Sequence, residues 1–414
     1  MPTRIRAFDR RFRNGLTRGV AALMVAAMLT PATPTQVVAE ASKPATLDNP
    51  DAVAYARRYD LPVDEAIWRL DVQGRAGVLS AWLDENAATW SGGLYVQHEP
   101  TLRIVVLATT MDVPGLSQAA ATAGIADLIT VVKVDATLAE LTADANALAA
   151  ELSGGLVYVD VRSNAVVVEG PQEASVAAAA QKARVRHQPT FVRSDRQVIP
   201  AALTYAGKIV SDDIGYLCTT GFSMVKSGVR RLTTAAHCPL ADDYDPPMRV
   251  QGVSMGIVDS QYGGSHDELL LSVGTLTPTN RTHDGSRDTQ TPGYRLISGK
   301  ITRANQAIGS YYCRYGWSAD GNFGCGHLAS KTVQGAMPNA ALTSMLLEAD
   351  SGDDLATGGD SGGPVFTFGG ALGLIHGCVG TIVSCGSPGV INDMIYVAIN
   401  YVESGLSATL LTSP

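Results

Sequence analysis

The feature of this 414-residue chain that most constrains its fold is the placement of its cysteines. All six lie in the last 197 residues, and residues 40–217 contain none. In an exported chain an even number of cysteines indicates disulfides, here three, although six cysteines allow fifteen pairings. No pair has CxxC spacing, so a zinc site is not favoured. The sequence therefore predicts a cross-linked second half and a first half without cross-links. The six are Cys218, Cys238, Cys313, Cys325, Cys378 and Cys385.

The first 39 residues differ from the rest of the chain. Six arginines lie within residues 1–18, an apolar run follows at 20–29, and Val37 and Ala39 are small residues suited to a cleavage site. This is the pattern of a secretory signal peptide. A retained membrane anchor is the alternative, but a run of ten apolar residues is far short of the ~20 that span a bilayer. We therefore expect a secreted protein without stable membrane association.

The remaining chain divides into two regions with different sequence patterns. Apolar residues have helical spacing in 48–90, and helices predicted at 137–152 and 172–184 alternate with short apolar strands, which indicates an α+β region. Residues 185–200 are expected to form a linker. From about residue 201, Gly and Pro recur about every 8–12 residues between short apolar runs, which is typical of an all-β sandwich or barrel.

Length and composition set outer limits. With roughly 100–200 residues per domain, 414 residues favour two domains, and 46% hydrophobic residues are ample for their cores. The net charge of -8 provides no basic surface for nucleic acid, so no nucleic-acid partner is expected.

The stretch LATGGDSGGPVF, residues 355–366, surrounds one serine with small residues. Such a cluster between apolar runs is often only a loop. A nucleophilic serine, however, needs an accessible turn, a general base, a group that orients the base, and N–H donors for an oxyanion. Gly358 and Gly359 would let the backbone bring N–H groups toward a carbonyl oxygen, together with the N–H of Ser361.

The base and its orienting group have candidates upstream. Among seven histidines, His237 stands out because it ends an apolar strand in RLTTAAHC and a cysteine follows it directly. Asp267 lies in GGSHDELLLSV, at a junction between a loop and a buried strand. Glu268 is its rival, but its longer side chain is expected to point the other way.

The motifs TAAHC, HDELLL and GDSGGP, in the order His, Asp, Ser, resemble those of chymotrypsin-like serine proteases. CTTGF (218–222) and CRYGWSADGNFGCG (313–326) are more similar to the bacterial branch, the streptogrisins and alpha-lytic protease. The N-terminal half resembles the prodomain of that group. The resemblance covers roughly 50–400 and is strongest at 218–238 and 358–366. It implies an all-β catalytic domain of two antiparallel six-stranded β-barrels, preceded by an α+β prodomain.

The resemblance also implies residue roles. His237 matches the general base, Asp267 its orienting group and Ser361 the nucleophile. The N–H groups of Gly359 and Ser361 match the oxyanion hole. Two disulfides, Cys218–Cys238 and Cys313–Cys325, match bridges of the bacterial group, and a local bridge would then join Cys378 and Cys385.

Arg314 matches an arginine that pairs with the aspartate before the nucleophile, here Asp360. Such a built-in ion pair would make the active conformation independent of a newly cut N-terminus. The prodomain would then act as a folding helper and inhibitor. The alternative is that Arg314 is a surface arginine.

Two positions depart from the family pattern. Thr357 stands where many relatives have a cysteine. In LIHGCVG (374–380), the segment matching the strand that pairs with substrate, His376 replaces a small serine. His376 and Gly377 are therefore candidate substrate-binding residues, and His376 either hydrogen-bonds Asp267 or simply packs.

The specificity pocket also has a candidate. Leu355, six residues before Ser361, would lie near the base of the primary pocket, which favours an apolar residue before the scissile bond. Asp353 and Asp354 are close enough in sequence to weaken that inference.

Together these features predict a signal peptide (1–39), a prodomain (40–199) and a protease domain (200–414). The enzyme would hydrolyse protein or peptide substrates through an acyl-enzyme, as a monomer without metal or cofactor. Its prodomain would be a partner that it removes itself, near 195–205. One alternative is a secreted binding module without activity, suggested by the altered strand at His376 and Cys378. The other is an esterase with the same triad.

Overall fold

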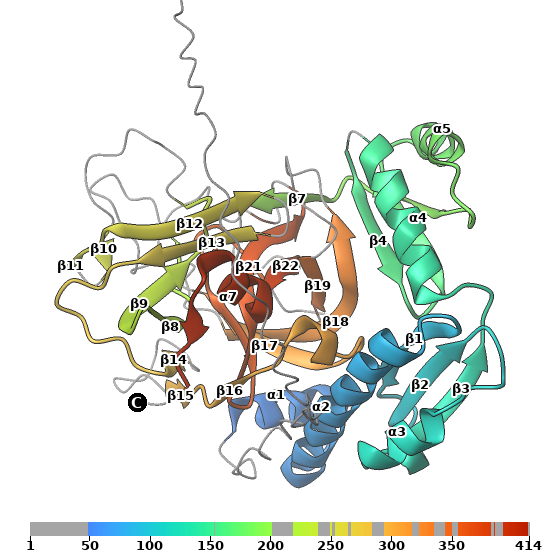
Figure 1. Cartoon of the computed structure of the whole chain (residues 1–414), viewed down its shortest axis with the longest axis horizontal. Coiled ribbons are helices and arrows are strands. Elements are labelled where there is room, and N and C mark those ends of the chain that lie inside the picture. Colours follow the sequence, from blue (N-terminus) through green and yellow to red (C-terminus); the bar gives the residue numbers. More distant parts are fainter. Residues whose placement is uncertain are drawn as a thin grey trace, which may run out of the picture. The chain divides into compact units, whose positions relative to one another are not determined.

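The computed structural model (Figure 1) describes the chain from residue 49 onward, with gaps. The chain divides into two compact units, Met1–Ala41 and Ser42–Pro414, and every described residue belongs to the second. The predicted signal peptide (1–39) lies outside the described residues. None of the described helices combines the length and apolarity of a membrane crossing. The described residues are 49–152, 154–200, 218–238, 249–250, 253–263, 266–283, 294–316, 323–334, 344–349, 355–381, 385 and 392–412, with backbone only at 197–200, 283 and 294.

Two helices occupy the stretch 48–90, which the sequence predicts as one continuous helix. Helix α1 (Pro50–Tyr59) ends at Asp60, which has a left-handed φ of 51°. Pro62 then precedes α2 (Val63–Asn86). Proline has no N–H to continue a helix and disfavours helical backbone in the residue before it. Pro62 therefore explains locally why α1 and α2 are separate helices.

A small sheet follows α2. Strand β1 (Ser91–Gln97) pairs antiparallel with β2 (Arg103–Ala108), and β2 pairs parallel with β3 (Ile129–Lys133). The short helices α3 (Leu116–Thr122) and η1 (Ala126–Leu128) make the crossover. The sheet and α2 bury one apolar cluster, which includes Leu79, Leu83, Ile104 and Val106.

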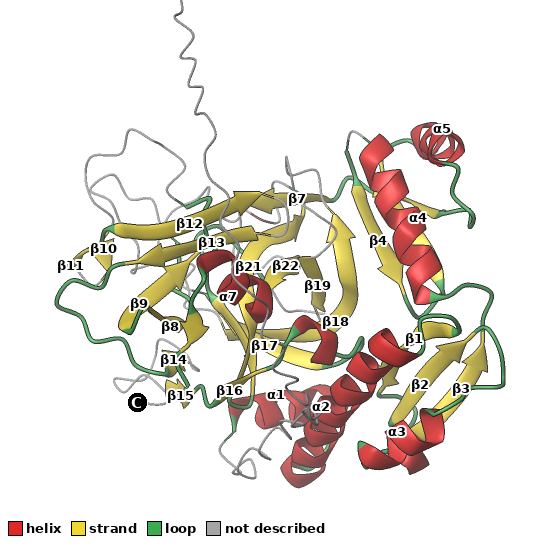
Figure 2. Ribbon diagram, viewed as in Figure 1, coloured by secondary structure: helices red, strands yellow, loops and turns green. Residues whose placement is uncertain are grey.

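The next segment is a second α+β layer. Helix α4 (Leu138–Glu151) packs against α5 (Glu173–Ala183) and against the hairpin of β4 (Leu156–Asp160) and β5 (Ala165–Gly170). Strand β6 (Thr190–Arg193) lies parallel to β5. An α+β region thus precedes the β-rich part of the chain, as predicted, and Figure 2 shows the helices α1 to α5 in it.

The prediction that residues 185–200 form a linker is wrong. This segment contains β6 and a further strand, β7 (Gln197–Pro200), which pairs antiparallel with β21 (Gly370–Gly380). Both strands are short, and the partner of β7 lies more than 170 residues away, so the local sequence carries little signal for it.

The β-rich part begins with an antiparallel sheet. Among the described residues it has five strands in the order β12-β13-β9-β8-β23. Two separate two-stranded ribbons belong to the same stretch of sequence: β10–β11 lies between β9 and β12, and β14–β15 follows β13. The bounds are β8 (Ser223–Lys226), β9 (Val229–Thr234), β10 (Arg249–Val250), β11 (Val253–Ser254), β12 (Ile257–Gly263), β13 (His266–Leu271), β14 (Arg281–His283), β15 (Tyr294–Leu296) and β23 (Thr409–Leu410).

A closed barrel follows. Six strands pair in the order β17-β20-β21-β22-β19-β18, and β18 pairs back with β17 to complete the ring. This closed barrel confirms the predicted all-β fold class for the second half. The bounds of the remaining elements are β16 (Gly299–Lys300), η2 (Arg303–Asn305), β17 (Tyr311–Tyr315), β18 (Phe323–Gln334), β19 (Ser344–Ala349), β20 (Pro364–Thr367), β22 (Asp393–Ala398) and α7 (Ile399–Leu406).

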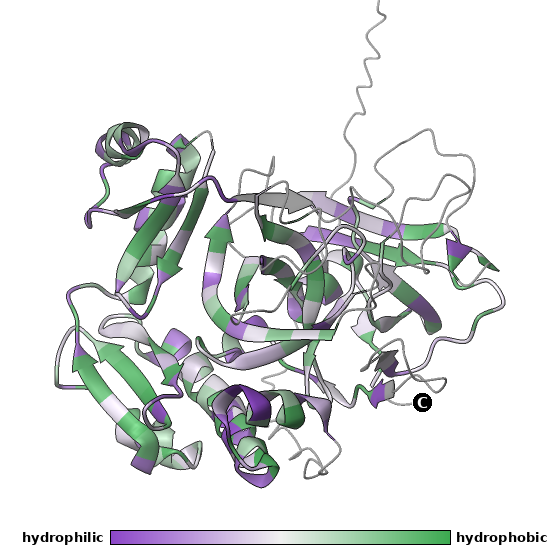
Figure 3. Cartoon of the chain, turned by 180° about the vertical axis from the view of Figure 1, so that it is seen from behind, coloured by the Kyte–Doolittle hydropathy of each residue, from purple (hydrophilic) through white to green (hydrophobic). Residues whose placement is uncertain are grey.

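The N-terminal region and the barrel share a sheet and a core. Strand β18 pairs with β4, with Val333 opposite Tyr158, so the hairpin β4–β5 extends the barrel sheet. One apolar cluster contains Val157 and Val168 from the hairpin and Leu347 from the barrel. Hydrophobic residues run along the strands of both parts (Figure 3). The described chain is therefore one packed body.

Candidate active site

The three predicted catalytic residues and the candidate substrate-binding residue His376 come from two different sheets. His237 follows β9, and Asp267 belongs to β13, in the five-stranded sheet. Ser361 precedes β20, and His376 lies in β21, in the closed barrel. In Figure 1 the ends of β13 and β21 lie near one another, which brings these four side chains together.

The turn around Ser361 requires glycine. Gly359 and Gly362 have φ of 102° and 81°, in the left-handed range that side chains disfavour. A Cβ on Gly362 would also lie 2.4 Å from the backbone nitrogen of Ala235, two residues before His237. The glycines therefore allow the serine turn to pack directly against the histidine loop.

The residues directly before and after His237 fix its position. Strand β9 ends at Thr234, whose hydroxyl donates to the carbonyl of Thr219, and Ala235 and Ala236 are buried. Directly after the histidine, Cys238 forms a disulfide with Cys218. The loop that carries the imidazole is thus cross-linked to the segment that leads into β8.

A continuous series of hydrogen bonds joins the three predicted residues. The Nε2 of His237 lies 2.7 Å from the Oγ of Ser361, and its Nδ1 lies 2.6 Å from Oδ2 of Asp267. The backbone N–H of His237 donates to Oδ1 of Asp267 at 2.9 Å. All three side chains are buried. Because the carboxylate only accepts, Nδ1 carries the proton and Nε2 is free to take one from the serine hydroxyl.

The charge of Asp267 is stabilised despite its burial. Burial alone would raise the pKa of this carboxyl, but the imidazoles of His237 and His376 and their hydrogen bonds outweigh it and hold the pKa well below its usual range. Asp267 is therefore an anion at neutral pH, able to stabilise a positive charge that forms on His237.

Glu268, the rival of Asp267, faces away from the histidine base. Its Oε2 accepts the N–H of Asp267 at 2.7 Å, and its Oε1 lies 2.5 Å from Nδ1 of His266. A Cβ on Gly405 of α7 would meet Glu268, so the side chain is enclosed by that helix. Burial raises the pKa of Glu268 to about 9. The longer side chain does point the other way, as expected from the sequence.

Arg314 and Asp360 form an ion pair with no exposed surface. The Nη1 of Arg314 lies 3.3 Å from Oδ2 of Asp360. The same oxygen accepts the N–H of Thr357 at 3.0 Å and lies 3.4 Å from its hydroxyl. Thr357, the departure from the family pattern, thus helps to fix the residue beside Ser361. The alternative that Arg314 is a surface arginine is wrong.

The predicted oxyanion donors lie in this same turn. Among the described residues, no hydrogen bond uses the N–H of Gly359 or Ser361. Their carbonyls are engaged: Thr219 donates its hydroxyl to the carbonyl of Gly359 and its N–H to that of Ser361, both at 2.8 Å. Sequence reasoning missed Thr219, although it directly follows Cys218 within CTTGF.

The candidate substrate-binding residues separate into two groups. Gly377 lies opposite Pro200 of β7, and His376 is its neighbour in β21. The Nδ1 of His376 lies 2.6 Å from Oδ2 of Asp267. Leu355 is fully buried and packs in the barrel core; a Cβ on Gly326 would lie 2.9 Å from its Cδ1. Residues 351–354, which include both aspartates weighed against Leu355, lie outside the described residues.

All six cysteines form disulfides. Besides Cys218–Cys238, Cys313 pairs with Cys325, directly opposite it in the β17–β18 ladder. Cys378 pairs with Cys385, seven residues later. The cross-links are thus confined to the second half of the chain.

One group of side chains in the described part of the chain could hold a metal ion. The ligand atoms of His237, Asp267 and His376 lie within 4.8 Å of one another. In this structure those atoms hydrogen-bond to each other and to Ser361.

No protein-family model matches the chain. About half of it is similar to solved structures of bacterial proteases of the group that the motifs resemble. Protease A of Thermobifida fusca is 25% identical, with a TM-score of 0.39, over 50% of this chain and 98% of that chain. A Nocardiopsis protease is 22% identical with the same TM-score and coverage. An alpha-lytic protease homologue is 16% identical, with a TM-score of 0.36, over 50% and 98%.

Proposed function

We propose that this chain is a secreted serine endopeptidase, made as a precursor whose N-terminal region covers its active site. The observation that carries the proposal is the series Ser361 Oγ, His237 Nε2, His237 Nδ1 and Asp267 Oδ2, with contacts of 2.7 and 2.6 Å. A nucleophile, a base and an orienting carboxylate in this order are what acyl transfer from a peptide requires.

In the proposed reaction the Oγ of Ser361 attacks the scissile carbonyl and forms a C–O bond while His237 takes the hydroxyl proton at Nε2. Asp267 stabilises the resulting imidazolium. The imidazolium then protonates the leaving amine, the C–N bond breaks, and an acyl-enzyme remains. Water, deprotonated by His237, attacks the acyl carbon, and Ser361 regains its proton as the acid leaves.

The tetrahedral oxyanion needs donors that are already in place. The N–H groups of Gly359 and Ser361 are the candidates, because Thr219 fixes the carbonyls of the same two residues from behind. Each oxyanion donor contributes about 2.7–4 kcal/mol in hydrolases of this kind. The buried pair of Arg314 and Asp360 supports a turn that is formed without a new N-terminus.

The precursor part of the proposal rests on β7. This strand pairs antiparallel with β21 next to His376 and Gly377, where a substrate strand would pair, and Ser361 has no exposed surface. An intact N-terminal region would therefore exclude substrate. Cleavage after Pro200, in the second half of the proposed window 195–205, would release β7 from covalent continuity with the barrel.

The test is expression of the full chain beside Ser361→Ala, followed by N-terminal sequencing and labelling with a fluorophosphonate. The proposal expects the wild-type chain to be cut within 195–205 and labelled at Ser361, and the variant to stay full length and unlabelled. Hydrolysis of labelled casein separates an endopeptidase from an esterase that accepts only small esters. An unlabelled, uncut wild-type chain would overturn the proposal in favour of a binding module.

A further inference from the structure

Asp267 receives a second imidazole besides that of the proposed base. The Nδ1 atoms of His237 and His376 both lie 2.6 Å from the same oxygen, Oδ2. The two rings are nearly perpendicular, at 87°, with centroids 5.9 Å apart. With the backbone N–H of His237 on Oδ1, the carboxylate accepts three N–H groups.

The contacts determine the tautomer of His376. A carboxylate accepts and never donates, so the proton of His376 lies on Nδ1. Its Nε2 is buried and has no hydrogen-bond partner in the described part of the chain. His376 therefore acts as a donor to Asp267 through Nδ1.

The hydrogen bond of His376 also joins the two halves of the site. Asp267 and His237 belong to the five-stranded sheet, whereas Ser361 and His376 belong to the closed barrel. A bond from His376 to Asp267 thus holds the base and its carboxylate at a fixed distance from the nucleophile.

We propose that His376 is a positioning residue, which aligns the His237–Asp267 pair with Ser361 and shares the charge of Asp267 with the base. This inference rests on the proposed function. Losing the donor leaves the base and its carboxylate less well aligned with Ser361, which lowers kcat.

Other charged or titratable groups near this pair are few. Glu268 contacts Asp267 only through its backbone N–H and is paired with His266 on the far side. Tyr262 lies opposite Asp267 in the β12–β13 ladder. Neither residue contacts His376 in the hydrogen bonds described, so a loss of kcat that follows removal of the His376 donor is attributable to the shared carboxylate.

Two substitutions separate donation from packing. His376→Phe keeps a ring and removes the donor. His376→Asn removes the ring and places an amide N–H near the position of Nδ1. We expect kcat for a chromogenic ester to fall about ten- to hundredfold in His376→Phe with little change in KM, since a hydrogen bond to a charged group is lost. His376→Asn should stay within about threefold of wild type.

Wild-type activity in His376→Phe, or equal losses in both variants, would overturn the inference, because packing alone would then explain the residue. Failure of the proposed function looks different: the wild-type chain itself would show no hydrolysis that depends on Ser361.

An NMR measurement on inactive Ser361→Ala tests the shared carboxylate without any activity assay, so it does not depend on whether the His376 variants fold well. In ¹⁵N-histidine-labelled full-length Ser361→Ala, proton NMR should show two strongly deshielded imidazole N–H signals, one from each histidine bonded to Asp267. Adding His376→Asn should remove one of them and leave the other. A single such signal in the parent protein would refute the shared carboxylate regardless of any variant.

Discussion

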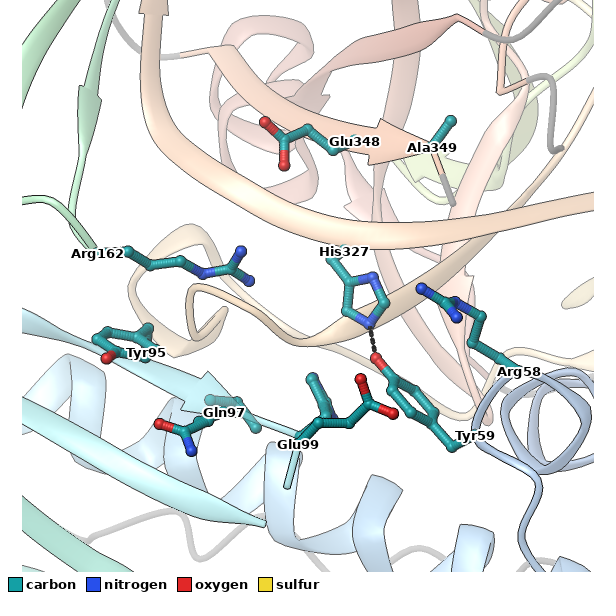
Figure 4. A pocket seen from close by; sticks show the side chains of 11 residues that line it. Arg58, Tyr59, Tyr95, Gln97, Glu99, Arg162, His327, Glu348 and Ala349 are labelled. Carbon is teal, nitrogen blue, oxygen red and sulfur yellow. Dashed lines mark hydrogen bonds between the residues drawn. The ribbon is translucent and has the colours of Figure 1, made fainter. Parts of the chain in front are cut away.

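His98 and His327 face each other across the junction between the N-terminal region and the barrel, with ring centroids 5.0 Å apart. His98 follows β1, and its two nitrogens contact the hydroxyl of Tyr55 at 2.6 Å and the carbonyl of Gly309 at 2.7 Å. His327 lies in β18, with Nε2 2.5 Å from the hydroxyl of Tyr59. Both line a pocket of about 410 Å³, in which Figure 4 shows His327 between Arg58 and Arg162.

This junction should weaken in acid. Burial, and then the charge of His327, lower the pKa of His98 from 6.5 to about 3. A base whose pKa falls on folding contributes stability that is complete above the unfolded pKa and is lost as the pH drops toward the folded one. Between pH 7 and 5 the loss is about 2 kcal/mol. Unfolding of full-length Ser361→Ala at the two pH values would measure it.

His98→Gln is the matched control, because glutamine retains a donor for Gly309 and does not titrate. Its stability should fall by about 2 kcal/mol less than that of the parent between pH 7 and 5. Parallel losses in the two proteins would show that His98 does not carry the acid sensitivity.

The buried pair of Arg314 and Asp360 predicts a large cost for either single change. Removing one partner leaves the other charge buried without its ion-pair partner, which costs about 3–5 kcal/mol. Urea unfolding of Arg314→Met and of Asp360→Asn, each in Ser361→Ala, would measure this. The double variant should recover part of the loss because no charge is left unpaired. A single-variant cost below about 1 kcal/mol would contradict a buried pair.

The sequence could nominate the candidate site because each catalytic residue has a local signal. His237 ends an apolar strand before a cysteine, Asp267 begins another strand, and Ser361 lies among glycines. Thr219 lacks such a signal, because its contacts with the serine turn depend on how the two sheets pack. His376 is nominated by the resemblance alone, which leaves its bond to Asp267 and simple packing as alternatives, and only the packed sheets bring the two side chains together.

The same distinction explains the fold. Helices α4 and α5 were predictable from periodicity within one segment, and the break before α2 follows from Pro62. Strand β7 was predicted as part of a linker because its four residues become a strand only beside β21. Elements whose structure depends on a partner far away in the sequence, such as β7, cannot be predicted from a local pattern.

Glu268 predicts a pH effect of the opposite sign to that of His98. Burial raises its pKa from 4.5 to about 9, so the folded chain keeps it protonated while the unfolded chain ionises it. The stability that the neutral form contributes is present below pH 4.5 and is lost as the pH rises toward 9. Glu268→Gln mimics the neutral acid: its amide oxygen can accept from Asp267 and its N–H can donate to His266.

Relative to its Ser361→Ala parent, the Glu268→Gln variant should therefore gain stability as the pH rises from 5 to 8, measured by thermal unfolding of both proteins. Glu173→Gln, at an exposed position in the first turn of α5, is the control and should leave the pH dependence unchanged. A pH dependence in Glu268→Gln equal to that of its parent would show that Glu268 is ionised in the folded chain.

Gly362 and Gly228 allow the strain of the serine turn to be separated from its packing. Both have left-handed backbones, with φ of 81° and 76°. A Cβ on Gly228, in the turn between β8 and β9, would meet nothing within 4 Å, whereas one on Gly362 would collide with the backbone of Ala235.

Gly228→Ala should therefore cost only the conformational strain of about 1–2 kcal/mol and leave kcat/KM unchanged. Gly362→Ala should cost more stability and lower kcat/KM by more than about tenfold, since the serine turn must move away from the histidine loop. Equal effects of the two substitutions on unfolding and on kcat/KM would mean that the close approach at Gly362 does not hold the nucleophile in place.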